Sequence, residues 1–233
     1  MSLNPQILKQ ANIFNGFWER FSEQVGSGKG VSDFPASQHM TPKYVTTIAR
    51  IPDDIARKVE LIGQEIISIH PHHYLYPSTD LHFTFINLDA FFPDGFQEQH
   101  EIIFEALEEA VENLPPLEFE AKGVGLFPTT IFVQLYDTHG VIEQYRTVIN
   151  RIVRETLKLP LIENKVIAEH IAFINLIRFK EVPGRTILDV IKPLRETSFG
   201  TFTASQLELV TTDKLLSRQN TITHHGFPLN HAQ

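Results

Sequence analysis

Two short stretches of the chain decide its fold: His82-Phe-Thr-Phe-Ile-Asn-Leu88 and His170-Ile-Ala-Phe-Ile-Asn-Leu176. They are identical at five of seven positions and lie 88 residues apart. Each copy follows a segment with the pattern of a helix and a loop, which is what an internally duplicated half-domain leaves behind. A chance likeness between two apolar strands is the alternative, and we favour the duplication.

The segments around the two copies alternate between strand patterns and helix patterns. Strands are predicted over residues 44–51, 81–88, 169–179, 201–212 and 221–229, and two more within 117–137, around a Gly/Pro turn. Helices are predicted from residue 52 onward and over residues 96–114, 141–159 and 186–196. This mixture, with no G-x-G-x-x-G after a strand, predicts an α+β fold and makes a dinucleotide-binding fold a weak alternative.

Residues 1–40 read differently from the rest of the chain. Residues 7–21 have the apolar stripe of an amphipathic helix, and a linker rich in Gly, Ser and Pro follows them. We therefore expect an N-terminal extension, residues 1–40, that docks on a single two-lobed domain formed by residues 41–233.

Composition narrows the classes of function. The chain has 233 residues, 42% of them hydrophobic, and a formal net charge of −8, which argues against a long duplex nucleic acid as partner. The absence of cysteine excludes disulfides, thiolate metal sites and a cysteine nucleophile. No apolar run has the length of a membrane span, and the N-terminus lacks a signal-peptide layout. We expect a soluble, cytoplasmic protein with no membrane partner.

Chemistry is concentrated in the repeated stretches. Side chains alternate along a strand, so His82 and Thr84 share one face, as do His170 and Ala172. If the two halves pack about a pseudo-two-fold axis, the imidazoles can face each other across a cleft. One neutral and one protonated histidine could then accept and donate the protons of phosphodiester hydrolysis, and the Thr84 hydroxyl could hold a phosphate oxygen.

These motifs resemble those of the two-histidine (2H) phosphoesterase superfamily, in particular its LigT-like branch of 2′-5′ RNA ligases and cyclic phosphodiesterases. The resemblance covers about residues 42–229 and includes Ile51-Pro52, the segment 123–128 and the closing segments 207–212 and 227–229. It implies a bilobal fold with two pseudo-symmetric antiparallel sheets, outer helices and a central cleft. It also implies that the two histidines are the acid and the base, and that Phe127 can stack on a base. A position in the core is the alternative for Phe127.

The activity implied by the resemblance is hydrolysis of 2′,3′-cyclic phosphates of nucleotides or RNA ends, with no metal and no cofactor. Two departures from the family pattern bear on this activity. Ala172 stands where the family has a second Thr or Ser, and Asn87 stands where many members carry Arg. A non-catalytic nucleotide or RNA-end binding protein is therefore the alternative function, and a scaffold in which the repeat is only structural is a third.

Other candidates are weaker. The HPHH segment at residues 70–73 and the tail residues His224, His225 and His231 lack the spacing of a metal site, and GSGKG at 26–30 misses the P-loop spacing. Four basic residues are candidates for extra phosphate contacts: Arg50, Lys122, Arg178 and Arg218.

Overall fold

The computed structural model describes residues 4–32, 34, 44–88, 100–112, 114–157 and 170–229. The strands are β1 (Tyr44–Arg50), β2 (Tyr74–Leu75), β3 (His82–Asn87), β4 (Leu117–Leu126), β5 (Thr130–Asp137), β6 (Ala172–Arg178), β7 (Ser198–Ala204), β8 (Gln206–Thr212) and β9 (Ile222–Pro228). The helices are α1 (Pro5–Gly26), α2 (Asp53–Ile69), α3 (His100–Val111), α4 (Ile142–Leu157) and α6 (Ile187–Ile191). Short 3₁₀ turns are η2 (Ser78–Asp80), η4 (Lys192–Glu196) and η5 (Arg218–Asn220).

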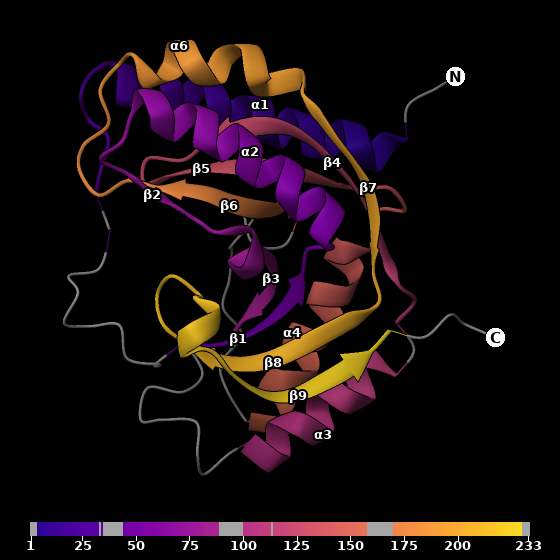
Figure 1. Cartoon of the computed structure of the whole chain (residues 1–233). Coiled ribbons are helices and arrows are strands. Elements are labelled where there is room, and N and C mark those ends of the chain that lie inside the picture. The colour runs from indigo at the N-terminus through magenta and orange to yellow at the C-terminus, as the bar shows by residue number, and fades with distance from the viewer. Residues whose placement is uncertain are drawn as a thin grey trace.

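The strands form two antiparallel sheets, which occupy the upper and lower lobes in Figure 1. The four-stranded sheet has the order β3-β1-β8-β9, and the five-stranded sheet has the order β2-β6-β5-β4-β7. Each repeated stretch enters a different sheet, β3 the first and β6 the second. The predicted α+β architecture with two antiparallel sheets is confirmed.

The two lobes exchange helices. Helix α2 follows β1 of the four-stranded sheet but packs on β6 and β7 of the other sheet, and α4 follows β5 but packs on β3. The strands β3, β1 and β8 of one sheet correspond in order to β6, β5 and β4 of the other, with the repeated stretches β3 and β6 in equivalent places. This is the arrangement that a duplicated half-domain would produce, and it brings β3 and β6 into contact at the junction of the lobes.

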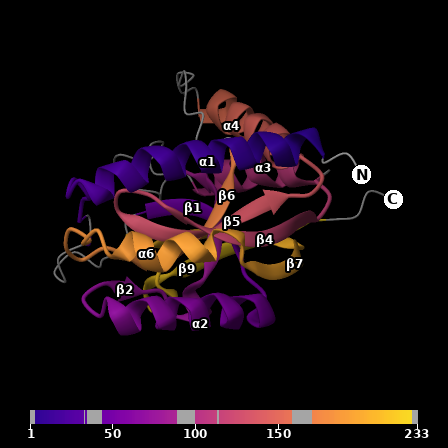
Figure 2. The same cartoon turned by 90° about the horizontal axis from the view of Figure 1, so that it is seen from above.

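Helix α1 covers the face of the five-stranded sheet opposite to α2 (Figure 2). Asn4 caps its start, because the side chain accepts a hydrogen bond of 2.9 Å from the main-chain nitrogen of Gln6. On its buried face the Phe14 ring lies 6.0 Å from the Phe132 ring and 5.5 Å from the Tyr136 ring. The helix predicted over residues 7–21 therefore exists, is longer than expected, and docks on the sheet.

Two elements differ from the sequence prediction. The strand expected over residues 201–212 is two strands, β7 in the five-stranded sheet and β8 in the four-stranded sheet, separated at Ser205. Alternation continues through both strands, so the pattern alone does not reveal the change of sheet. The helix expected over residues 186–196 is shorter, because Pro193 follows α6 and the chain continues as η4.

Arg146 joins the two lobes. It is a buried residue of α4, and its Nε donates to the main-chain oxygen of Phe85, Nη2 to that of Thr84, and Nη1 to that of Ile171. The first two oxygens belong to β3, and the third immediately precedes β6. A single guanidinium thus satisfies buried carbonyls of both repeated stretches.

Arg146→Met should lower the free energy of unfolding by about 3 kcal/mol or more, since it removes charge-assisted hydrogen bonds and leaves buried carbonyls without donors. Arg151→Met, an exposed position on the same helix, is the matched control and should change stability little. Urea unfolding of both variants is the measurement. Equal losses for the two variants would contradict the role of Arg146 as a link between the lobes.

Candidate active site

His82 is held as one defined tautomer. It is the first residue of β3 and is 3% exposed, and its Nδ1 lies 2.7 Å from the main-chain oxygen of Asp80. A carbonyl oxygen can only accept, so the proton of the neutral ring is on Nδ1 and the lone pair is on Nε2. Nε2 is therefore the atom through which His82 can take up a proton.

The surroundings of His82 keep its ring neutral. Burial lowers the pKa of His82 to about 4, against the opposing effect of the hydrogen bond to Asp80. The positive charges of Arg50 and Arg178 lower the pKa further, because they repel the imidazolium. The neutral imidazole can accept a proton, and the two guanidinium groups beside it can bind an anion.

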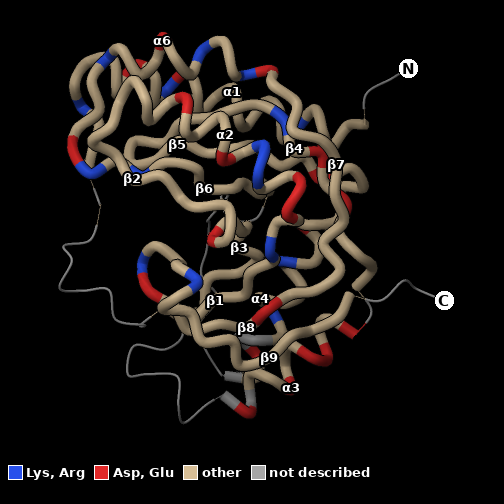
Figure 3. The backbone as a smooth tube through the Cα atoms, in the orientation of Figure 1, with Lys and Arg blue, Asp and Glu red and all other residues tan. Residues whose placement is uncertain are grey.

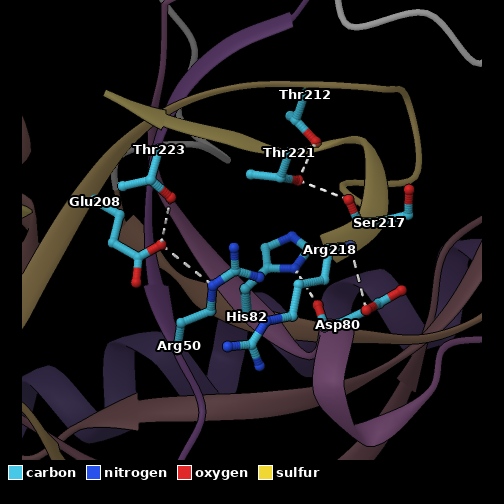
Figure 4. Close-up of polar contacts among 9 residues, drawn as sticks. All are labelled: Arg50, Asp80, His82, Glu208, Thr212, Ser217, Arg218, Thr221 and Thr223. Carbon is cyan, nitrogen blue, oxygen red and sulfur yellow. Dashed lines mark hydrogen bonds and ion pairs between the residues drawn. The ribbon is translucent and has the colours of Figure 1, made fainter. Parts of the chain in front are cut away.

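Arg50 lies directly opposite His82 in the pairing of β1 with β3. Its Nε is 3.3 Å from a carboxylate oxygen of Glu208, which the Thr223 hydroxyl also approaches, at 3.5 Å. Its Nη1 is buried and has no hydrogen-bond partner within the described residues. Figure 4 shows the Arg50 and Arg218 side chains converging on the His82 ring. Arg50 therefore keeps a buried donor available beside the imidazole.

A buried carboxylate shapes the loop that carries Arg218. Asp213 accepts hydrogen bonds from the main-chain nitrogens of Leu215 and Ser217, from the Ser217 hydroxyl, and from the Asn220 side chain. The main-chain nitrogen of Arg218 in turn donates to the Asp80 carboxylate at 3.2 Å (Figure 4). The same Asp80 thus orients the His82 ring through its main chain and fixes the Arg218 loop through its side chain.

His170 has a different environment. It lies two residues before the start of β6, and its side chain is 16% exposed. Nδ1 lies 2.8 Å from a carboxylate oxygen of Glu143, which also forms an ion pair of 2.8 Å with Lys9 of α1. Partial burial acts to raise the pKa of Glu143, but the contacts with Lys9 and His170 lower it overall. A carboxylate at Nδ1 orients the ring and leaves Nε2 to face other groups.

The two repeated stretches pass each other in opposite directions. Arg146 ties Thr84 and Phe85 of β3 to Ile171 at the start of β6, whereas His82 is influenced by Arg178 at the end of β6. The two histidines therefore lie on either side of this crossing, in the contact between the lobes. Within the described residues no hydrogen bond joins the two rings, so their shared contact with one phosphate stays a prediction.

The third positions of the two motifs also differ. Thr84 is partly exposed, whereas Ala172 is 3% exposed and pairs with Leu135 of β5. Thr84 shares a face of β3 with His82 by alternation, whereas His170 lies outside β6 in a helical conformation, so alternation does not place it with Ala172. The phosphate-binding role of Thr84 and the missing donor at Ala172 stay predictions.

Phe127 lies under helix α1. Its ring stacks on Phe132 at 4.3 Å and contacts the rings of Phe17, Phe21 and Phe173 at 5.2 to 5.8 Å. These four rings account for the position of Phe127 without a ligand. Its base-stacking role stays a prediction.

The remaining candidates are spread over the molecule. Lys122 pairs with Glu196 at 3.2 Å, and Nε2 of His224 lies 2.7 Å from the Thr211 hydroxyl. His73 is buried with its ring 4.9 Å from that of Phe179. Among the described residues no group of three or more His, Asp or Glu is placed to hold a metal ion. His231 lies outside the described residues.

Sequence reasoning passed over three residues that build this site: Glu143, Arg146 and Asp213. Arg146 left a signal, because it interrupts an apolar helical face that includes Ile142 and Ile149. A charge on such a face predicts a buried polar contact. Glu143 and Asp213 left no comparable signal, since acidic residues are ordinary on exposed helices and loops.

Solved structures with the same architecture are known. TT0787 of Thermus thermophilus superposes with a TM-score of 0.60 at 14% identity, covering 80% of this chain and 97% of that one. E. coli LigT complexed with ATP gives 0.53 at 13% identity, covering 82% and 99%, and ATU0111 of Agrobacterium tumefaciens gives 0.52 at 10%, covering 89% and 96%. No family model and no curated protein matches the sequence. Among the described helices, none is long and apolar enough to cross a membrane.

The protonation of His82 should make the free energy of unfolding depend on pH. Its folded-state pKa of about 4 lies below the ordinary 6.5, so the unfolded chain binds the proton first as the pH falls. Stability should therefore be lost as the pH falls from about 6.5 toward 4, by about 3 kcal/mol from this group. His82→Gln should lack this share of the loss in urea unfolding at successive pH values.

Nitrogen NMR of the imidazole provides an independent check. It should show the ring neutral at pH 6 with the proton on Nδ1. A ring that titrates near pH 6.5, or one with its proton on Nε2, would show that Asp80 and burial do not control His82.

Proposed function

We propose that this chain, which has the fold of the LigT-like two-histidine phosphoesterases, hydrolyses 2′,3′-cyclic phosphates of nucleotides or RNA ends. The observation that carries the proposal is His82: a neutral imidazole, with its lone pair on Nε2, beside Arg50 and Arg178. The E. coli LigT structures solved with ATP and with 3′-AMP support a nucleotide as the class of ligand.

In the proposed reaction a water molecule attacks the phosphorus of the cyclic phosphate. Nε2 of His82 accepts the proton of this water as the new P–O bond forms. His170, protonated and oriented by Glu143, donates a proton to the 3′ oxygen as the P–O3′ bond breaks. The product is a 2′-phosphate with a free 3′ hydroxyl, as the family resemblance implies. The tautomer and pKa of His82 favour it as the base, and the carboxylate at His170 favours that residue as the acid.

In this proposal the arginines stabilise the negative charge of the phosphate. A cyclic phosphodiester carries one negative charge, and further charge develops on its non-bridging oxygens as water attacks. Glu208 already holds the Arg50 guanidinium in place, and the Tyr76 hydroxyl holds that of Arg178. These two groups can therefore stabilise the developing charge with little rearrangement. The Thr84 hydroxyl supplies an uncharged donor from β3.

A binding protein without turnover is the second candidate, and Ala172 is the observation that favours it. The second motif has no hydroxyl, so one expected phosphate donor is missing. Both candidates predict nucleotide binding, and only the first predicts product.

His82→Gln and His170→Gln should each lower kcat/KM for adenosine 2′,3′-cyclic phosphate by a factor of about 100 or more, because each removes a proton transfer. His139→Gln, an exposed histidine paired with Glu118, is the matched control and should retain activity. Chromatography of the adenosine monophosphate product, with and without EDTA, is the measurement. Full activity of His82→Gln would end the proposed mechanism, and binding without product in the parent would favour the second candidate.

The motif hydroxyl can be tested in both halves. Thr84→Ala should lower turnover by roughly tenfold to a hundredfold, because a preorganised donor to the transition state is lost, whereas Thr84→Ser should retain most activity. Ala172→Ser adds a hydroxyl in a buried position and should raise turnover modestly. Rates are compared on one substrate at one pH after folding is verified. Parent-like activity of Thr84→Ala would show that this face of β3 does not bind the phosphate.

A further inference from the structure

A cavity of about 660 Å³ opens beside the candidate active site. Asp80 and Arg218, which line it, also belong to the His82 cluster: Asp80 accepts from His82 Nδ1, and Arg218 converges on the ring (Figure 4). The cavity therefore borders the Asp80 side of the His82 ring. Its volume is in the range of pockets that hold small-molecule ligands.

The wall of the cavity is aromatic. It includes Phe34 and Tyr74, whose rings are 5.4 Å apart, together with Pro77 and Leu215. Lys180 Nζ lies 5.1 Å from the centre of the Phe34 ring and 6.0 Å from that of Tyr74. An apolar wall with aromatic rings and a nearby cation suits a flat aromatic ligand.

Gln219 is one of the polar side chains of the lining that a ligand could reach. The Thr79 hydroxyl donates to Asp80, and the Ser217 hydroxyl donates to Asp213. Gln219 is exposed and makes no side-chain hydrogen bond within the described residues. A side-chain amide carries both donors and an acceptor, which is what the edge of a nucleobase requires.

Phe34 comes from the N-terminal segment, far from the rest of the lining in sequence. The segment is fixed just before it, because the Ser32 hydroxyl reaches the main-chain oxygens of Phe179 and Lys180 at 3.2 and 2.8 Å. The main-chain nitrogen of Val31 also donates to the oxygen of Pro128 at 3.0 Å. The segment that follows α1 thus contributes a wall of the cavity as well as docking on the domain.

We propose that this cavity holds the nucleobase of the substrate, with Phe34 and Tyr74 as its aromatic wall and Gln219 at the base edge. The proposal rests on the proposed function for the position of the phosphate at His82. It makes Phe34 a specificity residue, which distinguishes nucleotides from other cyclic phosphodiesters, rather than a catalytic residue.

The test uses two substrates, adenosine 2′,3′-cyclic phosphate and methyl riboside 2,3-cyclic phosphate, which lacks a base. Phe34→Ala should raise KM for the adenosine substrate about tenfold, with kcat nearly unchanged, because stacking is worth roughly 1–3 kcal/mol per base. The methyl riboside should not respond. Tyr44→Ala, an exposed aromatic residue at the start of β1, is the control and should change neither substrate. Equal effects of Phe34→Ala on both substrates, or no effect on either, would overturn the pocket.

Calorimetric binding of adenosine 2′-monophosphate separates this proposal from the proposed function. If the parent gives no product but binds this nucleotide, and Phe34→Ala weakens binding about tenfold while Tyr44→Ala does not, the pocket stands and the hydrolytic function fails. If the parent turns over both cyclic phosphates with the same KM, the function stands and the pocket fails. A parent that does not bind the nucleotide overturns the pocket.

Discussion

The contact between the two lobes depends on Arg146. β3 ends the four-stranded sheet, and β6 is flanked on its outer side only by the two-residue strand β2, so both expose main-chain groups at the junction of the lobes. Burying such groups without partners is costly, and the five donors of one guanidinium can satisfy several carbonyls in a fixed geometry. Because the oxygens come from Thr84, Phe85 and Ile171, the same interaction sets the relative position of the two histidine motifs.

The candidate site gathers cationic side chains in a chain of net negative charge. The net charge is −8, and Figure 3 shows Lys and Arg interspersed with Asp and Glu along the described backbone. Yet Arg50 of β1 and Arg178 of β6 come from different sheets and both act on one neutral imidazole, whose pKa they lower. Charges at such short range act on a bound anion far more strongly than the distant carboxylates do, because solvent and salt screen the latter. An acidic protein can therefore hold a small phosphate site.

The two histidines are chemically unequal although their motifs are nearly identical. Burial and the nearby guanidinium groups hold His82 neutral, whereas His170 faces the Glu143 carboxylate, which Lys9 near the start of α1 also contacts. The difference arises from the elements that surround each strand, not from the strands themselves. Lys9 of α1 forms an ion pair with Glu143, the carboxylate that contacts His170. Phe34, which follows α1 in sequence, lines the cavity beside His82. The N-terminal extension thus contributes to the surroundings of both histidines.

The sequence by itself determined most of the secondary-structure elements and the candidate catalytic histidines. The repeat at His82 and His170, the strand patterns around it and the turn signals predict an α+β fold with two equivalent strands, because alternation and turn chemistry are local properties. Tertiary structure alone decided that residues 201–212 divide between two sheets, that α1 covers Phe127, and that the Arg218 loop is tied to Asp80. These facts depend on which surfaces of distant segments pack together, and a side chain carries no local record of the partner that will cover it. The inequality of the two histidines has the same origin, since a pKa is set by burial and neighbouring charge rather than by the residue type.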